Sequence, residues 1–91
     1  MSLAVIEADL NDRGGTVTVQ ADSQEEVLSA GARQLAVQHA QSNGIPRAGT
    51  SGGEAAYPVN DQGETNDDLI FGRNGQRVAG YRCDFKITGG L

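Results

Sequence analysis

The fold is decided by the stretch GTVTVQADSQEEVLSAGARQLAVQHAQSNG, residues 15–44. Its opening, residues 16–21, alternates apolar with polar side chains at the period of two that indicates a strand. Ser23 followed by Glu26 is a capping-box signature, so we predict one helix over residues 23–43. At 100° per residue this helix has one narrow stripe, which consists of Leu28, Gly31, Ala32, Leu35 and His39. Glycine inside a helix costs about 1 kcal/mol of stability relative to alanine. The presence of Gly31 in this stripe therefore indicates that the helix approaches a sheet closely there.

A hairpin is predicted on each side of this central stretch. Residues 4–10 alternate and join the strand at 16–21 through a turn cluster, with one face formed by Ala4, Ile6, Ala8 and Leu10. Near the other end, residues 69–71 lead through a turn at 73–75 into a long strand that ends near Ile87. The preferred register of this second hairpin gathers one apolar face: Leu69, Phe71, Ala79, Tyr81, Cys83, Phe85 and Ile87.

The segment 45–66 has a different composition from the rest of the chain. It begins with Ile45-Pro46 and is dominated by glycine and by polar residues without periodicity. We predict a long loop, which is either a mobile functional loop or an ordered excursion pinned by Tyr57. The element order is therefore β-β-α-loop-β-β in a single domain over residues 1–91. Few small α+β folds have this order, and β-grasp is prominent among them.

Composition excludes several classes of protein. The 91 residues, 37% of them hydrophobic, suffice for one domain. A net charge of −5 without a basic patch disfavours nucleic-acid binding. The single cysteine excludes an intrachain disulfide and a cysteine-rich zinc module, and favours a reducing compartment. The longest apolar run, residues 3–6, is too short for a membrane helix, so we expect a cytoplasmic protein.

Several short motifs, in their order along the chain, resemble ubiquitin-like protein modifiers of the bacterial type. They are the strand Thr16-Val17-Thr18-Val19, the helix exit Gly44-Ile45-Pro46, Leu69-Ile70-Phe71 and the terminal Gly89-Gly90. The resemblance implies a β-grasp fold, with one helix packed on a four-stranded mixed sheet. The chain departs from the family in the short turn at 73–75, in the long segment 45–66 and in Leu91 after the diglycine.

The resemblance also implies a function. The protein would be a precursor that is trimmed after Gly90 and conjugated through its diglycine, on a flexible tail formed by residues 88–91. Gly89, Gly90 and Leu91 would then be the conjugation and processing residues. The implied partners are an activating adenylyltransferase, a conjugating or transfer protein, and a peptidase that removes Leu91. The protein would be a substrate of enzymes rather than an enzyme, and ATP would be used by the activating enzyme, so we expect no cofactor.

A partner-binding surface is predicted on the outer face of the second hairpin. In ubiquitin-like proteins the exposed side of the sheet is a common docking surface, and small apolar patches ringed by charge suit partners of modest affinity. The residues expected there are Ile70 and Val78, framed by Arg73, Arg77 and Arg82.

Other candidate residues have simpler interpretations. His39 has no matching ligands in the sequence, Cys83 falls on the predicted inner face, and Ser51 has no catalytic context. The acidic residues at 61–68 lack the spacing of a calcium loop, so no metal site is expected. Two alternatives to the modifier stay open. One is a non-conjugated acidic binding module, antitoxin-like or a phage-encoded inhibitor, and the other is a structural subunit that assembles through sheet edges.

Overall fold

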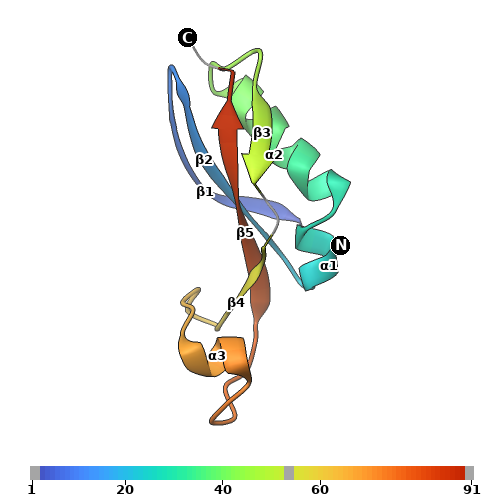
Figure 1. Cartoon of the computed structure of the whole chain (residues 1–91), viewed down its shortest axis with the longest axis vertical. Helices are drawn as coiled ribbons and strands as arrows, with labels where there is room; N and C mark the ends of the chain where they lie inside the picture. Colours follow the sequence, from blue (N-terminus) through green and yellow to red (C-terminus); the bar gives the residue numbers. More distant parts are fainter. Residues whose placement is uncertain (1–2, 53–54, 90–91) are drawn as a thin grey trace.

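The centre of the molecule is a three-stranded antiparallel sheet. The computed structural model describes residues 3–52 and 55–89. In it, β1 (Ala4–Asn11) and β2 (Gly14–Ala21) form a hairpin, and β5 (Gly80–Thr88) runs antiparallel along the other edge of β2 (Figure 1). The alternation predicted for β2 is confirmed, because Val17, Val19 and Ala21 are all buried on one face.

Two short strands complete the sheet on the far side of β5. β3 (Gly49–Gly52) pairs with the end of β5 and β4 (Tyr57–Val59) with its beginning, both antiparallel. The sheet is therefore five-stranded and antiparallel throughout, so the expected four-stranded mixed sheet is corrected in both respects. The segment 45–66, expected to be a loop, supplies both added strands. Each is too short to show a period of two in the sequence.

The predicted helix is divided into two helices. α1 (Gln24–Val27) begins at Ser23, whose hydroxyl accepts from the amide of Glu26 as the capping box requires. α2 (Ala30–Ser42) begins anew at Ser29, whose hydroxyl donates to the carbonyl of Glu26 and accepts from the amide of Ala32. A serine that bonds to both sides in this way ends one helix and caps the next.

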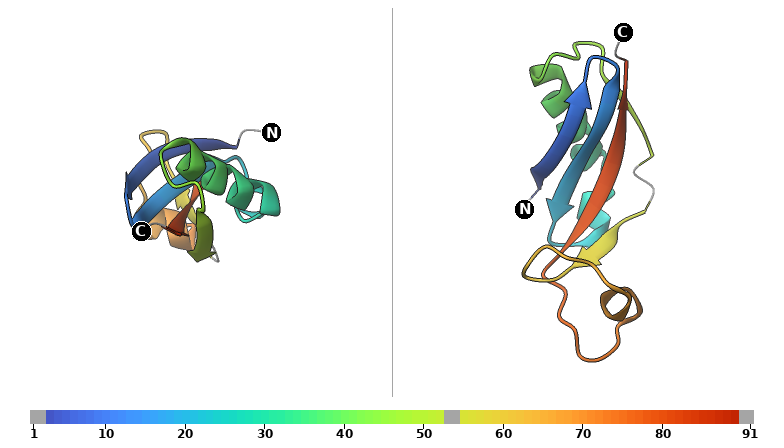
Figure 2. Two further views of the ribbon diagram at one scale, coloured as in Figure 1. Left: turned by 90° about the horizontal axis from the view of Figure 1, so that it is seen from above. Right: turned by 90° about the vertical axis from the view of Figure 1, so that its left-hand side faces the viewer.

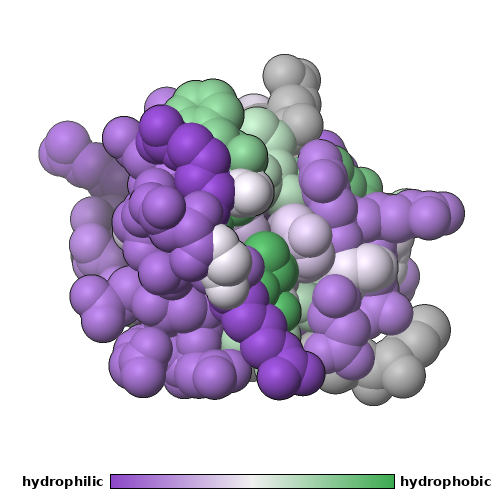
Figure 3. Space-filling model, turned by 90° about the horizontal axis from the view of Figure 1, so that it is seen from below, coloured by the Kyte–Doolittle hydropathy of each residue, from purple (hydrophilic) through white to green (hydrophobic). Residues whose placement is uncertain are grey.

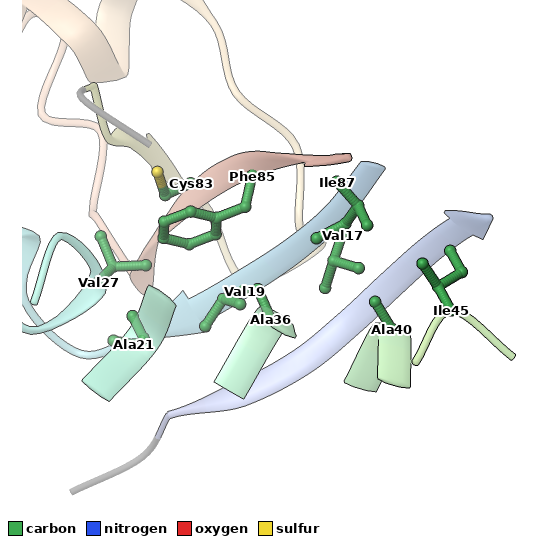
Figure 4. Close-up of a cluster of buried hydrophobic side chains, with 11 residues drawn as sticks. Val17, Val19, Ala21, Val27, Ala36, Ala40, Ile45, Cys83, Phe85 and Ile87 are labelled. Atoms are coloured by element: carbon green, nitrogen blue, oxygen red, sulfur yellow. The ribbon is translucent and has the colours of Figure 1, made fainter. Parts of the chain in front are cut away.

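The break at Ser29 changes the buried face of the helical region. The core residues of α2 are Ala32, Ala36 and Ala40, and these three small side chains pack with β2 and β5. Figure 4 shows side chains of β2, β5 and α2 gathered in one layer. Of the predicted stripe only Ala32 is fully buried, and Gly31 is exposed, so the predicted approach of Gly31 to the sheet is wrong.

The second predicted hairpin is absent from the described residues, because its first strand is a helix. α3 (Asp67–Phe71) is capped by Asn66, whose side chain accepts from the amide of Leu69 at 2.9 Å. Gly72 ends the helix in the left-handed conformation, with φ of 66°. Leu69 is buried as expected, whereas Phe71 and Ala79, expected on the inner face, are exposed. The inner face of β5 is confirmed at Cys83, Phe85 and Ile87.

The molecule is elongated, with principal extents of 46 × 22 × 20 Å. The helices α1 and α2 cover one face of the sheet, and the opposite face is open (Figure 2). The α3 segment lies at the far end of the long axis from the β1–β2 turn (Figure 1). Across residues 3–52 and 55–89, no helix has the length and apolar character needed to cross a membrane.

Candidate functional site

The end of the molecule around α3 is fixed to the sheet by a small apolar contact and by backbone hydrogen bonds. Leu69 of α3 and Val59 of β4 are 4% and 1% exposed and lie outside the main core cluster. The amide of Ala79 donates to the carbonyl of Val59 at 2.8 Å, which returns the chain to the start of β5. The side chain of Asn60 accepts from the amides of Gln62 and Glu64 and so orders the intervening turn.

Large apolar side chains are exposed at this end. Phe71 is 69% exposed, Ile70 51% and Val78 36%. Figure 3 views the molecule from this end and shows hydrophobic surface bordered by hydrophilic side chains. Such exposure marks a candidate binding site in a small protein, because the same side chains contribute most when a partner removes them from water.

Two arginines belong to the same end. The guanidinium of Arg73 lies 5.3 Å from the centre of the Phe71 ring, and its Nε is 3.7 Å from a carboxylate oxygen of Asp68. The cation–π contact and the ion pair hold Arg73 beside the exposed ring. Arg77 is exposed and has no ion pair within the described residues. We call the surface formed by Ile70, Phe71, Arg73, Arg77 and Val78 the tip surface.

Four of the five predicted partner-binding residues lie in the segment 70–78, which is exposed in the structure. Ile70 and Val78 are exposed, as expected, and Arg73 and Arg77 lie in the same segment. Arg82 lies instead on β5, where its Nε donates to the side-chain oxygen of Gln20 at 2.9 Å. Phe71 was missed by the sequence analysis. The sequence does contain a signal for it: Asn66-Asp67-Asp68 is typical of the start of a helix and Gly72 of its end. A short helix between them would have placed Phe71 on a different face from Leu69.

Of the candidate conjugation residues, the structure describes only Gly89, which lies beside Arg47 and the β1–β2 turn. Thr88 belongs to β5 and pairs with Gly49, so residue 88 is part of the sheet and the expected flexible tail does not begin there. Gly89 has φ of +97°, and a side chain on it would meet the carbonyl of Arg47. Its close backbone packing therefore requires glycine, independently of any conjugation chemistry. Gly90 and Leu91 lie outside the described residues.

The open face of the sheet is polar and carries two adjoining hollows. One, of about 290 Å³, is lined by Glu7, Asp9, Thr16, Thr18, Tyr57 and Asp84. The other, of about 520 Å³, shares Thr16 and Asp84 and extends to Arg13 and Lys86. Asp84 accepts from Thr18 Oγ1 at 2.6 Å and from the Tyr57 hydroxyl at 3.3 Å. This network joins β2, β4 and β5 on the open face.

The structure gives no chemical role to Cys83 or His39, the other candidate residues that were considered. Cys83 is buried in the core, and burial, followed by the charge of Asp84, raises the pKa of its thiol. A higher pKa leaves less thiolate, the form that reacts. The backbone carbonyl of His39 accepts from the side chain of Asn43. Within the described residues no group of three or more histidine, cysteine or carboxylate side chains is placed to hold a metal ion.

Comparisons with known proteins give no assignment: no family model, no curated protein and no solved structure matches the chain.

Proposed function

We propose that this protein is a small binding module that acts by protein–protein contact, and that its partner docks on the tip surface. The observation that carries the proposal is the exposure of Ile70, Phe71 and Val78 at one end of the molecule. Phenylalanine and arginine are enriched at protein interfaces, and the tip surface contains both. The Phe71 ring with Arg73 over it would be the central contact, because few residues carry most of the binding energy.

The charges around the tip surface indicate the chemistry of the partner. Arg73 already has Asp68 as an ion-pair partner, whereas Arg77 has none within the described residues. A partner with an apolar groove and a carboxylate at its rim would pair with Arg77 as Phe71 enters the groove. A rim pair of this kind contributes chiefly to the rate of association and to specificity.

Photo-cross-linking in an extract of the source cells tests the proposal. A cross-linker would be attached beside the tip surface in wild type and in the double variant Ile70→Ser/Phe71→Ser. Ile6→Ser is the matched control, because Ile6 is also an exposed apolar side chain, 38% exposed, but lies on β1. We expect one protein to be cross-linked by wild type and by the control, and to be lost from the double variant.

A binding titration with the purified cross-linked protein completes the test. Phe71→Ala should weaken binding by roughly tenfold or more, the effect of truncating a central interface residue. Equal cross-linking by all three proteins, or none by wild type, would contradict docking at the tip surface.

Conjugation through the C-terminal diglycine is a second proposal. It is supported by the order of the motifs along the chain and by the place of Gly89 directly after β5, whose end lies far from α3 (Figure 1). The proposal includes a β-grasp relationship, the adenylyltransferase, the transfer protein and the peptidase. The packing of Gly89 on Arg47 weighs against it, since the channel of an activating enzyme would have to displace that contact.

Incubation with candidate activating enzymes and ATP, followed by mass spectrometry, tests conjugation. Deletion of Gly90 must abolish adducts if transfer runs through its carboxylate, and adducts that persist would end this proposal. Lys86 is the only lysine, so chains linked through lysine would be rare.

Under either proposal the protein is not an enzyme. The single free cysteine, which is buried, supports a reducing compartment such as the cytoplasm.

A further inference from the structure

The outer edge of β1 is open within the described part of the chain. β1 is eight residues long and pairs only with β2, at the end of the strand order β1-β2-β5-β3. Figure 2 shows β1 at the margin of the sheet, with no ribbon beside its outer edge. An edge of this kind presents unpaired backbone amides and carbonyls to any extended chain that approaches.

The opposite edge of the sheet is much less suited to receive a strand. It consists of β3, with four residues, and β4, with three, and Pro58 in β4 has no backbone N–H to donate. An incoming strand would find no continuous ladder there. β1 is therefore the edge on which strand addition is possible.

The side chains of β1 distinguish its two faces. A bulge at Ile6 shifts the register between Val5 and Glu7, and after it the strand is regular to Asn11. Glu7 pairs with Thr18 and Asp9 with Thr16, and both carboxylates line the hollow on the open face. On the other face, Val5 and Leu10 are only partly buried against the core. The edge thus has acidic side chains on one face and half-covered apolar side chains on the other.

The charges disfavour a second copy of this chain as the occupant. Two copies of β1 paired antiparallel around Ala8 would place Glu7 of each opposite Asp9 of the other. A register centred on Asp9 would place the two Asp9 residues opposite each other. Like charges directly opposite are destabilising in an antiparallel pair.

We propose that the edge of β1, over residues 7–11, accepts an extended segment of a partner protein in which lysine or arginine alternates with apolar residues. The partner's backbone extends the sheet through the open edge. Its basic side chains lie beside Glu7 and Asp9, where cross-strand pairs of opposite charge are favourable. Its apolar side chains lie on the helix side, beside Ala8 and Leu10. This interface goes beyond docking at the tip surface, and either can fail without the other.

A short synthetic peptide of alternating lysine and valine is the probe. Titrated into the labelled protein at constant ionic strength, it should shift the backbone amide resonances of β1 and slow their exchange with solvent. A peptide with glutamate in place of lysine should bind more weakly by roughly twofold to thirtyfold, the range expected for two cross-strand charge pairs. The lysine peptide methylated on every backbone amide should not bind.

Variants separate strand addition from general attraction to an acidic protein. Glu7→Lys/Asp9→Lys should reverse the preference between the two peptides, and the milder Glu7→Gln/Asp9→Asn should remove it. Asp61→Lys/Glu64→Lys, which makes the same charge change at exposed positions of another turn, should retain it. The proposal would be overturned if the methylated peptide bound, or if the control variant also lost its preference for the lysine peptide. It would also be overturned if the shifted amide resonances lay outside β1. A dimer of the protein alone that protects the β1 amides would likewise overturn it, because a second copy would then occupy the edge.

Discussion

At the scale of single residues, Asp84 organises the open face of the sheet. It accepts from Thr18 on β2 and from Tyr57 on β4, so one carboxylate on β5 connects three strands. Thr18 is 6% exposed and its hydroxyl has this carboxylate as partner, which satisfies a buried polar group. The contact with Tyr57 fastens β4, which has only three residues to hold it to β5.

The titration of Tyr57 checks this network. Burial chiefly, then the charge of Asp84 and its hydrogen bond, raise the pKa of the Tyr57 phenol above the usual value of about 10. In the folded protein the phenol therefore keeps its proton to higher pH than in the unfolded chain. The stability it contributes is complete below about pH 10 and is lost as the pH rises through the folded pKa.

Absorbance titrations of wild type and Tyr57→Phe isolate this phenol. Their difference should show ionisation above its usual pH, and Asp84→Asn should lower that pKa. An unshifted difference curve would mean that Tyr57 does not face Asp84.

Gly31→Ala should stabilise the protein. Gly31 is exposed on α2, and an added methyl would meet only Ser29 Oγ at 3.6 Å and Leu3 Cδ1 at 3.7 Å, which are ordinary contacts. The expected gain in the free energy of unfolding is about 1 kcal/mol, measured by urea denaturation. A loss would mean that the helix does approach the sheet at this residue.

At the scale of elements, α3 is a helix because its ends are specified and not because its length favours it. Five residues cannot form a stable helix alone, so the Asn66 cap, the left-handed Gly72 and the buried Leu69 must hold it together. Asp67 and Asp68 in the first turn also complement the helix dipole.

Asn66→Ala should therefore loosen the end of the molecule without unfolding the sheet. Loss of an N-cap costs about 1 kcal/mol, and here the cost falls on α3. Hydrogen exchange should become faster at the amides of Leu69 and Ile70, while β2 and β5 remain protected. Asn43→Ala, which removes another asparagine at a helix end, is the control and should leave α3 unchanged. Unchanged exchange at Leu69 in Asn66→Ala would show that the cap does not hold the helix.

The sequence predicts long periodic elements well and short ones poorly in this chain. β2 and the inner face of β5 follow from alternation, because each has enough residues to show a period of two. β3 and β4 have no such signal and are held by pairing with β5, a contact distant in sequence. The division of the helix at Ser29 depends on a hydroxyl that bonds in both directions, which composition does not reveal.

The tip surface was predicted only in part, because residues 67–71 form a helix where a strand was expected. Ile70 and Val78 are exposed in the structure and in the predicted hairpin, although a helix and an irregular segment replace its strands. Phe71 was expected inside because a strand at 69–71 would turn it to the same face as Leu69. In a helix, residues two apart point in different directions, and Phe71 is exposed as a result.

At the scale of the whole molecule, folding and proposed binding use different regions. The main core lies between the sheet and the helices α1 and α2, and the tip surface lies outside it. Because the tip is fixed through Leu69 and Val59, the neighbouring Ile70 and Phe71 remain available to a partner. Substitutions at the tip surface should therefore affect binding far more than stability.

The most direct test is the free energy of unfolding of Phe71→Ala, compared with Leu69→Ala, by urea denaturation. Phe71→Ala should change this free energy by no more than about 0.5 kcal/mol, because the ring is 69% exposed. Leu69→Ala should lose about 2–5 kcal/mol, because its side chain is buried. If Phe71→Ala loses as much as Leu69→Ala, Phe71 belongs to the core and the tip surface has no exposed ring to offer a partner.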